Sequence, residues 1–110
     1  MDDQVMKLLF DAQQAIDSIL SFTKPIANFN EYKKNKLVRR AVERELEIVG
    51  EIMKRLRDKH PEISINGKDQ IIGFRNRLSH GYDSVDDAIV WGILIRHIPV
   101  LKNEIDVLIG

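Results

Sequence analysis

Two arginines, an asparagine, a histidine and a tyrosine gather in one short stretch of this sequence, and together they suit chemistry on phosphate. They are Arg75, Asn76, Arg77, His80 and Tyr82. An imidazole with a pKa of about 6.5 can give or take a proton at neutral pH. A guanidinium offers a fixed positive fork that matches two phosphate oxygens. The stretch therefore indicates a phosphate-handling site.

The same residue types fit in-line attack of an RNA 2′-hydroxyl on its own phosphate. His80 would move protons, and Arg75 would stabilise charge on the phosphorane-like transition state. This reaction needs no metal ion and excludes DNA, which lacks the 2′-hydroxyl. Asn76 lies four residues before His80 and could orient the imidazole. Arg77 is a candidate RNA contact, although a solvated surface arginine explains it equally well.

A helix from Lys68 to His80 is the predicted element that carries these groups. Gly81 follows it at the position where glycine commonly ends a helix. On a continuous helix Arg75 and His80 would point about 140° apart, so we expect the helix end to free His80 from the helical repeat. Spacing alone does not establish catalysis, because an arginine and a histidine at this separation occur by chance in many helices.

Three further helices are expected to support this segment. Apolar residues recur at helical spacing from Asp2 to Phe22, from Glu31 or Asn35 to Lys59, and from Val85 to Ile109. Residues 26–30 and 61–67 are predicted connections, each beside a proline that cannot continue a helix. The pattern predicts an all-α fold, an antiparallel up-and-down four-helix bundle formed as one domain by residues 1–110.

The second predicted helix contains an interior glycine and a row of glutamates. Gly50 costs about 1 kcal/mol relative to alanine, and a close helix crossing would explain it. Glu43, Glu47 and Glu51 share one side of the helix. A di-metal site would add a Glu-x-x-His pair, which these glutamates lack. We therefore expect a salt-bridged face, with partners three or four residues away among Arg40, Arg44, Lys54 and Arg55.

The last predicted helix has three features of its own. Ser84 with Asp87 is a capping pattern for its start, and Pro99 should kink or divide it. Its apolar residues cover more than one side, which is wider than the single stripe that a bundle buries. This width predicts self-association through this last helix, alone or together with the helix from Lys68 to His80.

Composition limits the classes of protein. With 110 residues, 44% hydrophobic and 31% charged, the chain suits one soluble domain. The absence of cysteine excludes disulfides and thiolate sites and agrees with a reducing cytoplasm. No stretch reaches the roughly 18 apolar residues of a membrane span. Residues 33–59 carry ten basic and five acidic side chains, a segment that could bind a polyanion or form a solvated face.

The order Arg75-Asn76-x-x-x-His80-x-Tyr82 resembles the signature of the HEPN superfamily, and the trailing His-x-Tyr is similar to its HepT branch. Further segments also resemble this branch: Ala41 to Glu51, His60-Pro61-Glu62-Ile63, and Val90-Trp91 with Ile98-Pro99 and Leu101. The resemblance implies an all-helical homodimer whose Arg-His motifs meet across the interface and cut RNA without metal or cofactor. Arg75 and His80 would then be the catalytic pair, with Asn76 as the supporting polar residue.

The resemblance also implies a partner, an MNT-type nucleotidyltransferase antitoxin that transfers AMP to Tyr82. An adenylate there would place a phosphate and a base where substrate RNA should lie. The protein would be an endoribonuclease toxin that can assemble further with its antitoxin. The alternative is a non-catalytic helical subunit that binds a nucleotidyltransferase and contributes to its substrate binding.

Overall fold

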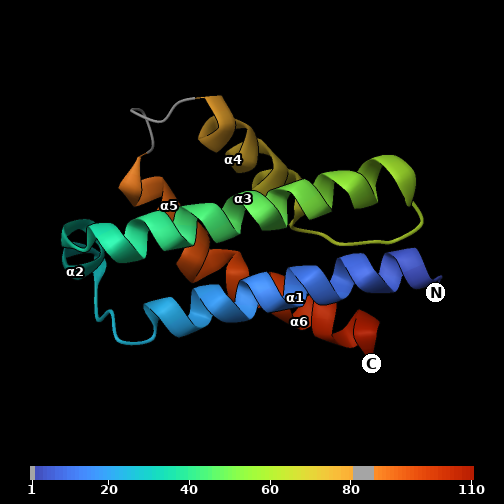
Figure 1. The fold of residues 1–110 in the computed structure, drawn as a ribbon, viewed down its shortest axis with the longest axis horizontal. Coiled ribbons are helices and arrows are strands. Elements are labelled where there is room, and N and C mark those ends of the chain that lie inside the picture. The colour runs from blue at the N-terminus through green and yellow to red at the C-terminus, as the bar shows by residue number, and fades with distance from the viewer. Residues whose placement is uncertain (1, 81–85) are drawn as a thin grey trace.

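The structure is a computed structural model that describes residues 2–80 and 86–110, and it describes side chains for all of these except 76–80. This part of the chain is all-helical and contains six α-helices and no strand (Figure 1). The helices are α1 (Asp3–Thr23), α2 (Phe29–Lys34), α3 (Lys36–Lys59), α4 (Lys68–His80), α5 (Asp87–Arg96) and α6 (Ile98–Ile109). The predicted all-α class is confirmed.

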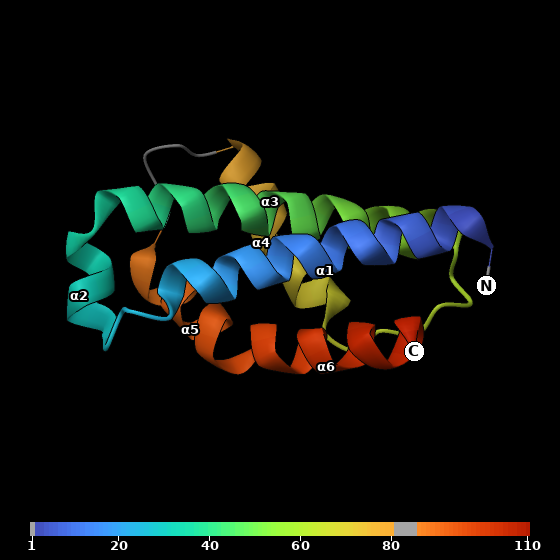
Figure 2. The ribbon, with the colours of Figure 1, turned by 60° about the horizontal axis from the view of Figure 1, so that its bottom comes forward.

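The two longest helices, α1 and α3, lie antiparallel and side by side in both views (Figures 1 and 2). Helix α4 packs against α3, and α6 packs against α1. Side chains at helical spacing on α1 and α3 meet in the core, where Leu9, Ile16, Leu46 and Met53 are almost completely buried. The hydrophobic faces of α1 and α3 therefore form the core, and α4 packs against α3.

The predicted helix from Lys68 to His80 is confirmed as α4. The linker before it is held by two buried side chains and by a hydrogen bond to α6. Ile63 and Ile65 are buried in the core, and the backbone N–H of Asn66 donates to Glu104 Oε2 on α6 at 2.8 Å. Ile71, Ile72 and Phe74 then bury one face of α4. The start of α4 is thus tied to the core and to α6.

Between α1 and α3 the structure corrects the sequence prediction. Residues 26–30 were expected to form a connection, but a short helix, α2, begins at Phe29 and ends at Lys34. Two asparagines explain it: the side chains of Asn28 and Asn35 accept hydrogen bonds from the N–H groups of Glu31 and Val38, each at 3.0 Å. Each asparagine caps the start of a helix, so the chain turns twice here.

The last predicted helix is divided, as Pro99 indicated. Helix α5 ends at Arg96, and α6 begins at Ile98 with Pro99 in its first turn, where a missing N–H costs no helical hydrogen bond. The predicted cap needs a correction, since Asp86 caps α5 by accepting from the N–H of Ala88 at 2.8 Å. Ser84 lies outside the described residues.

These two changes turn the four expected helices into six within the described residues. In this part of the chain, none of the helices combines the length and apolar character that crossing a membrane requires.

Candidate functional site

Arg75 is the member of the predicted site whose side chain the structure describes. Asn76, Arg77 and His80 lie in the remaining residues of α4, and their side chains fall outside the description. Gly81 and Tyr82 lie beyond the end of α4, outside the described residues. The described part of the site is therefore Arg75 together with the helix that faces it, α3.

Gly50 is the residue of α3 that lets α4 approach. A Cβ atom placed on Gly50 would overlap Arg75 Cβ, lie 2.8 Å from Arg75 Cγ and lie 3.2 Å from the carbonyl oxygen of Ile71. These distances are too short for any side chain at position 50 unless α4 moves. The close helix crossing predicted from Gly50 is confirmed, and the residue that crosses it is Arg75.

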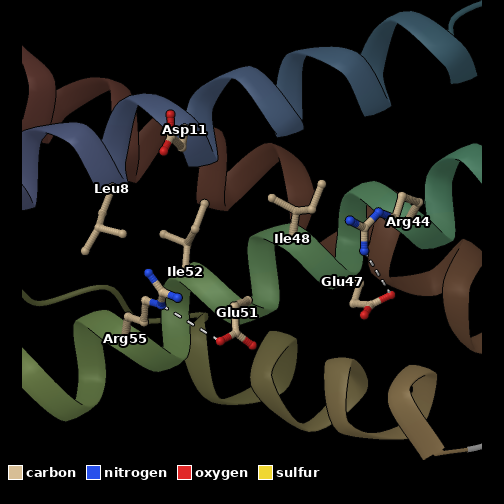
Figure 3. A pocket seen from close by; sticks show the side chains of 8 residues that line it. All are labelled: Leu8, Asp11, Arg44, Glu47, Ile48, Glu51, Ile52 and Arg55. Carbon is tan, nitrogen blue, oxygen red and sulfur yellow. Dashed lines mark ion pairs between the residues drawn. The ribbon is translucent and has the colours of Figure 1, made fainter.

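Glu51, the next residue on α3, holds the far end of the same arginine. Its Oε2 lies 2.6 Å from Arg75 Nη2, a charge-assisted contact in which the guanidinium donates. Its Oε1 lies 3.9 Å from Arg55 Nε, one turn later on α3. In Figure 3 the Glu51 side chain points toward α4, whereas Ile48 and Ile52 point toward α1. One carboxylate is therefore shared between two arginines.

Sequence reasoning missed this partner of Arg75, since it paired Glu51 only with residues of its own helix. The signal that could have found it is the neighbouring glycine. An interior glycine is one sign of a close approach between two helices, and a carboxylate beside that point can reach a cation on the second helix.

The rest of the glutamate row is ion-paired along α3, as predicted. Arg40 Nη1 lies 3.2 Å from Glu43 Oε1, and Arg44 Nη1 lies 3.7 Å from Glu47 Oε2. Among the residues that the structure describes, no three His, Cys, Asp or Glu side chains form a group able to hold a metal ion. The prediction of a salt-bridged face is confirmed.

A groove of about 450 Å³ lies between α1 and α3, close to this ion-paired face (Figure 3). Its charged walls are formed by two arginines, Arg44 and Arg55, and three acidic residues. The acidic residues are Asp11, Glu47 and Glu51. Because negative charge is in excess, the groove does not favour a polyanion.

A partly buried polar cluster joins α5 to α2 and α3 at the other end of the molecule. Arg39 Nη1 on α3 lies 3.5 Å from Asp87 Oδ2 in the first turn of α5. The Tyr32 ring lies 5.4 Å from the Trp91 ring, between centroids. Burial, together with the nearby Glu43 and Asp87 carboxylates, raises the pKa of the Tyr32 hydroxyl above its usual value. The cluster anchors the first turn of α5.

An all-helical chain with an arginine fixed where two helices cross, and a histidine in the same helix, has the features expected of HEPN-type proteins. Residues 12–108 match the sequence model of the family described as "Ribonuclease HepT-like". The chain therefore belongs to this HepT-like family of the HEPN superfamily.

Individual relatives agree with this assignment. "Putative RNase MJ1380" of Methanocaldococcus jannaschii is 33% identical over 107 residues, which cover 94% of each chain. "Probable ribonuclease HepT" of Thermococcus cleftensis is 34% identical over 102 residues, 89% of each chain. "Putative RNase TTE0752" of Caldanaerobacter subterraneus is 33% identical over 82 residues, 71% of this chain and 70% of its own. No solved structure matches the chain significantly.

Proposed function

We propose that this protein is a metal-independent endoribonuclease toxin of a HEPN/MNT toxin-antitoxin system. Membership of the HepT-like family and the names of its relatives, several of which are called RNases, support this function. The observation that carries the proposal is the placement of Arg75. Its guanidinium is fixed at the α3–α4 crossing, five residues before His80 at the end of the same helix.

In the proposed reaction, the 2′-oxygen of a ribose attacks the adjacent phosphorus and the bond to the 5′-oxygen breaks. His80 takes the proton of the 2′-hydroxyl or delivers one to the leaving oxygen. Arg75 stabilises the charge that develops on the phosphate. Asn76 supports the imidazole, and Arg77 contributes a further phosphate contact. The products carry a 2′,3′-cyclic phosphate and a 5′-hydroxyl.

The working unit in this proposal is a homodimer in which the motifs of two copies form one cleft. Exposed apolar side chains on α5 and α6 support self-association: Ile89, Ile95, Val100 and Val107 are 41–80% exposed. A surface hollow of about 370 Å³ beside Ile89, lined also by Gly92 and Arg96, offers a place for side chains of a second copy. Exposed apolar surface of this kind can mark a protein–protein interface.

Control of the toxin would rest on Tyr82. A nucleotidyltransferase antitoxin would transfer AMP to the Tyr82 hydroxyl, with pyrophosphate leaving from ATP. The added phosphate would compete with substrate RNA for the arginines of the motif. Mass spectrometry of protein co-expressed with its neighbouring nucleotidyltransferase would detect the modification, and Tyr82→Phe should remain unmodified.

Incubation of the purified, unmodified protein with RNA in EDTA tests the function. Wild type should produce fragments ending in 2′,3′-cyclic phosphate, and Arg75→Ala and His80→Ala should not. Arg57→Ala is a matched control, because Arg57 is a surface arginine of α3 that pairs with Asp58 at 3.0 Å. Cleavage that persists in His80→Ala would contradict the mechanism. A wild type that binds a nucleotidyltransferase but never cleaves would instead support the non-catalytic subunit.

A further inference from the structure

We propose that Glu51 is the positioning residue for the catalytic Arg75, an inference that rests on the proposed ribonuclease function. Glu51 would not contact RNA. It would act by holding the guanidinium in the orientation that meets the phosphate, and it would set the amount of positive charge that the site presents.

The first argument is geometric, because Arg75 is held at both ends. Its Cβ and Cγ occupy the space left by the missing side chain of Gly50. Its Nη2 lies 2.6 Å from Glu51 Oε2. An arginine side chain is otherwise long and flexible, and a guanidinium that is already oriented loses little freedom when substrate arrives. The 23% of the Arg75 side chain that stays exposed leaves it accessible to a phosphate.

The second argument concerns charge. The carboxylate of Glu51 lies between Arg75 and Arg55, so the three side chains together carry one net positive charge and not two. RNA binding strengthens with each cation near the phosphate backbone. Removing the carboxylate should therefore strengthen RNA binding while it releases the guanidinium. The stronger RNA binding should lower KM, and the loss of guanidinium orientation should lower kcat.

The experiment compares steady-state RNA cleavage by Glu51→Gln, Glu51→Asp and Glu47→Gln. Glu47 is a matched control, because it lies one turn earlier on α3, has a similar exposure and pairs with Arg44. We expect Glu51→Gln to lower kcat by about 10- to 100-fold and to lower KM. Glu51→Asp keeps the charge but withdraws the oxygens, so kcat should fall while KM stays near wild type. Glu47→Gln should keep the wild-type kcat.

Thermal unfolding checks that the variants are folded. Because the Glu51 side chain is 41% exposed, its replacement should change Tm little. In an Arg75→Lys background, the loss of Glu51 should reduce kcat much less than in wild type, because lysine has no planar guanidinium for Glu51 to orient. An equal kcat for Glu51→Gln and Glu47→Gln in an active enzyme would overturn the role of Glu51. If wild type itself fails to cleave RNA, the proposed function fails first, and this role in cleavage fails with it.

Discussion

Glu51 and Arg75 join α3 to α4 at 2.6 Å between Oε2 and Nη2, one residue after the glycine at which the two helices cross. Helix packing and side-chain orientation are thus fixed at the same place. Substitutions at Gly50 test this crossing. Substitutions at Tyr32 and Ile89 test two other features, the polar cluster that joins α5 to α2 and α3 and the exposed apolar surface.

Gly50→Ala should disturb both stability and cleavage. The added Cβ would overlap Arg75 Cβ and press on the backbone of Ile71, so α4 must shift or the arginine must leave. Overpacking of this kind costs about 1–3 kcal/mol of unfolding free energy, measurable by urea denaturation. We expect cleavage to fall further than the folded fraction does, because Arg75 itself is displaced.

The matched control is Gly73→Ala on α4, where a Cβ would meet nothing within 4 Å. Alanine is the better helix former by about 1 kcal/mol, so this variant should be as stable as wild type or more stable. If Gly50→Ala behaved like Gly73→Ala in both assays, the close crossing would not constrain Arg75.

Tyr32 should make the protein sensitive to alkaline pH. Its side chain is fully buried, its hydroxyl has no hydrogen-bond partner among the described residues, and burial raises its pKa. Below a pH of about 10 the tyrosine is neutral in both the folded and the unfolded chain. Above that pH only the unfolded chain ionises, so stability should fall by about 1.4 kcal/mol per pH unit until the raised pKa of the folded state is reached.

Tyr32→Phe removes the ionisable group and serves as the comparison for Tyr32. At neutral pH its free energy of unfolding should equal or exceed that of wild type by about 1 kcal/mol, because a buried hydroxyl without a partner is lost. Between pH 9 and pH 11, urea denaturation should show a smaller loss of stability than in wild type. Parallel losses in the two proteins would mean that Tyr32 ionises as freely when folded as when unfolded.

Ile89→Asp should separate the dimer that we propose. Ile89 is 41% exposed on α5 beside a surface hollow, and a buried unpaired carboxylate would be costly in an interface there. Light scattering should report a dimer for wild type and a monomer for the variant, and RNA cleavage should be lost with the dimer. Leu37→Asp is the control, because Leu37 is 81% exposed at the start of α3, on a different helix. A wild type that stays monomeric at micromolar concentration would contradict the dimer.

The apolar periodicity of the sequence was enough to predict the all-helical class, and the linker before α4 together with Gly81 after it gave the bounds of α4. It missed α2, because a helix of six residues has too few apolar positions for a period, and the two asparagine caps decide its bounds. Pro99 correctly marked the division of the last helix, since a proline acts on the backbone of its own segment. Features that depend on a local signal could therefore be predicted from the sequence. A short helix whose ends are set by side-chain caps was harder to predict.

For the candidate site, the sequence predicted the helix crossing but not the contact made there, and the catalytic roles stay untested. Residue types and order indicated Arg75 as a phosphate ligand, and the interior glycine indicated a helix crossing at position 50. The pairing of Arg75 with Glu51 could not be predicted, because it depends on which turn of α4 meets α3. Residues 24 positions apart in sequence become neighbours only through tertiary packing. The roles of all five predicted residues, Arg75, Asn76, Arg77, His80 and Tyr82, stay predictions.

The close contact between Gly50 and Arg75 means that a substitution at either position limits the residues that the other can accept. The stem of Arg75 fills the volume that a side chain at position 50 would need. Unless α4 shifts, a larger residue at position 50 would therefore require a smaller residue at position 75, and the arginine would be lost. Replacing an interior glycine is the usual first step when a helix is engineered for stability. In α3 that step would destabilise the protein, and any second substitution that restored the packing would select against the proposed catalytic residue.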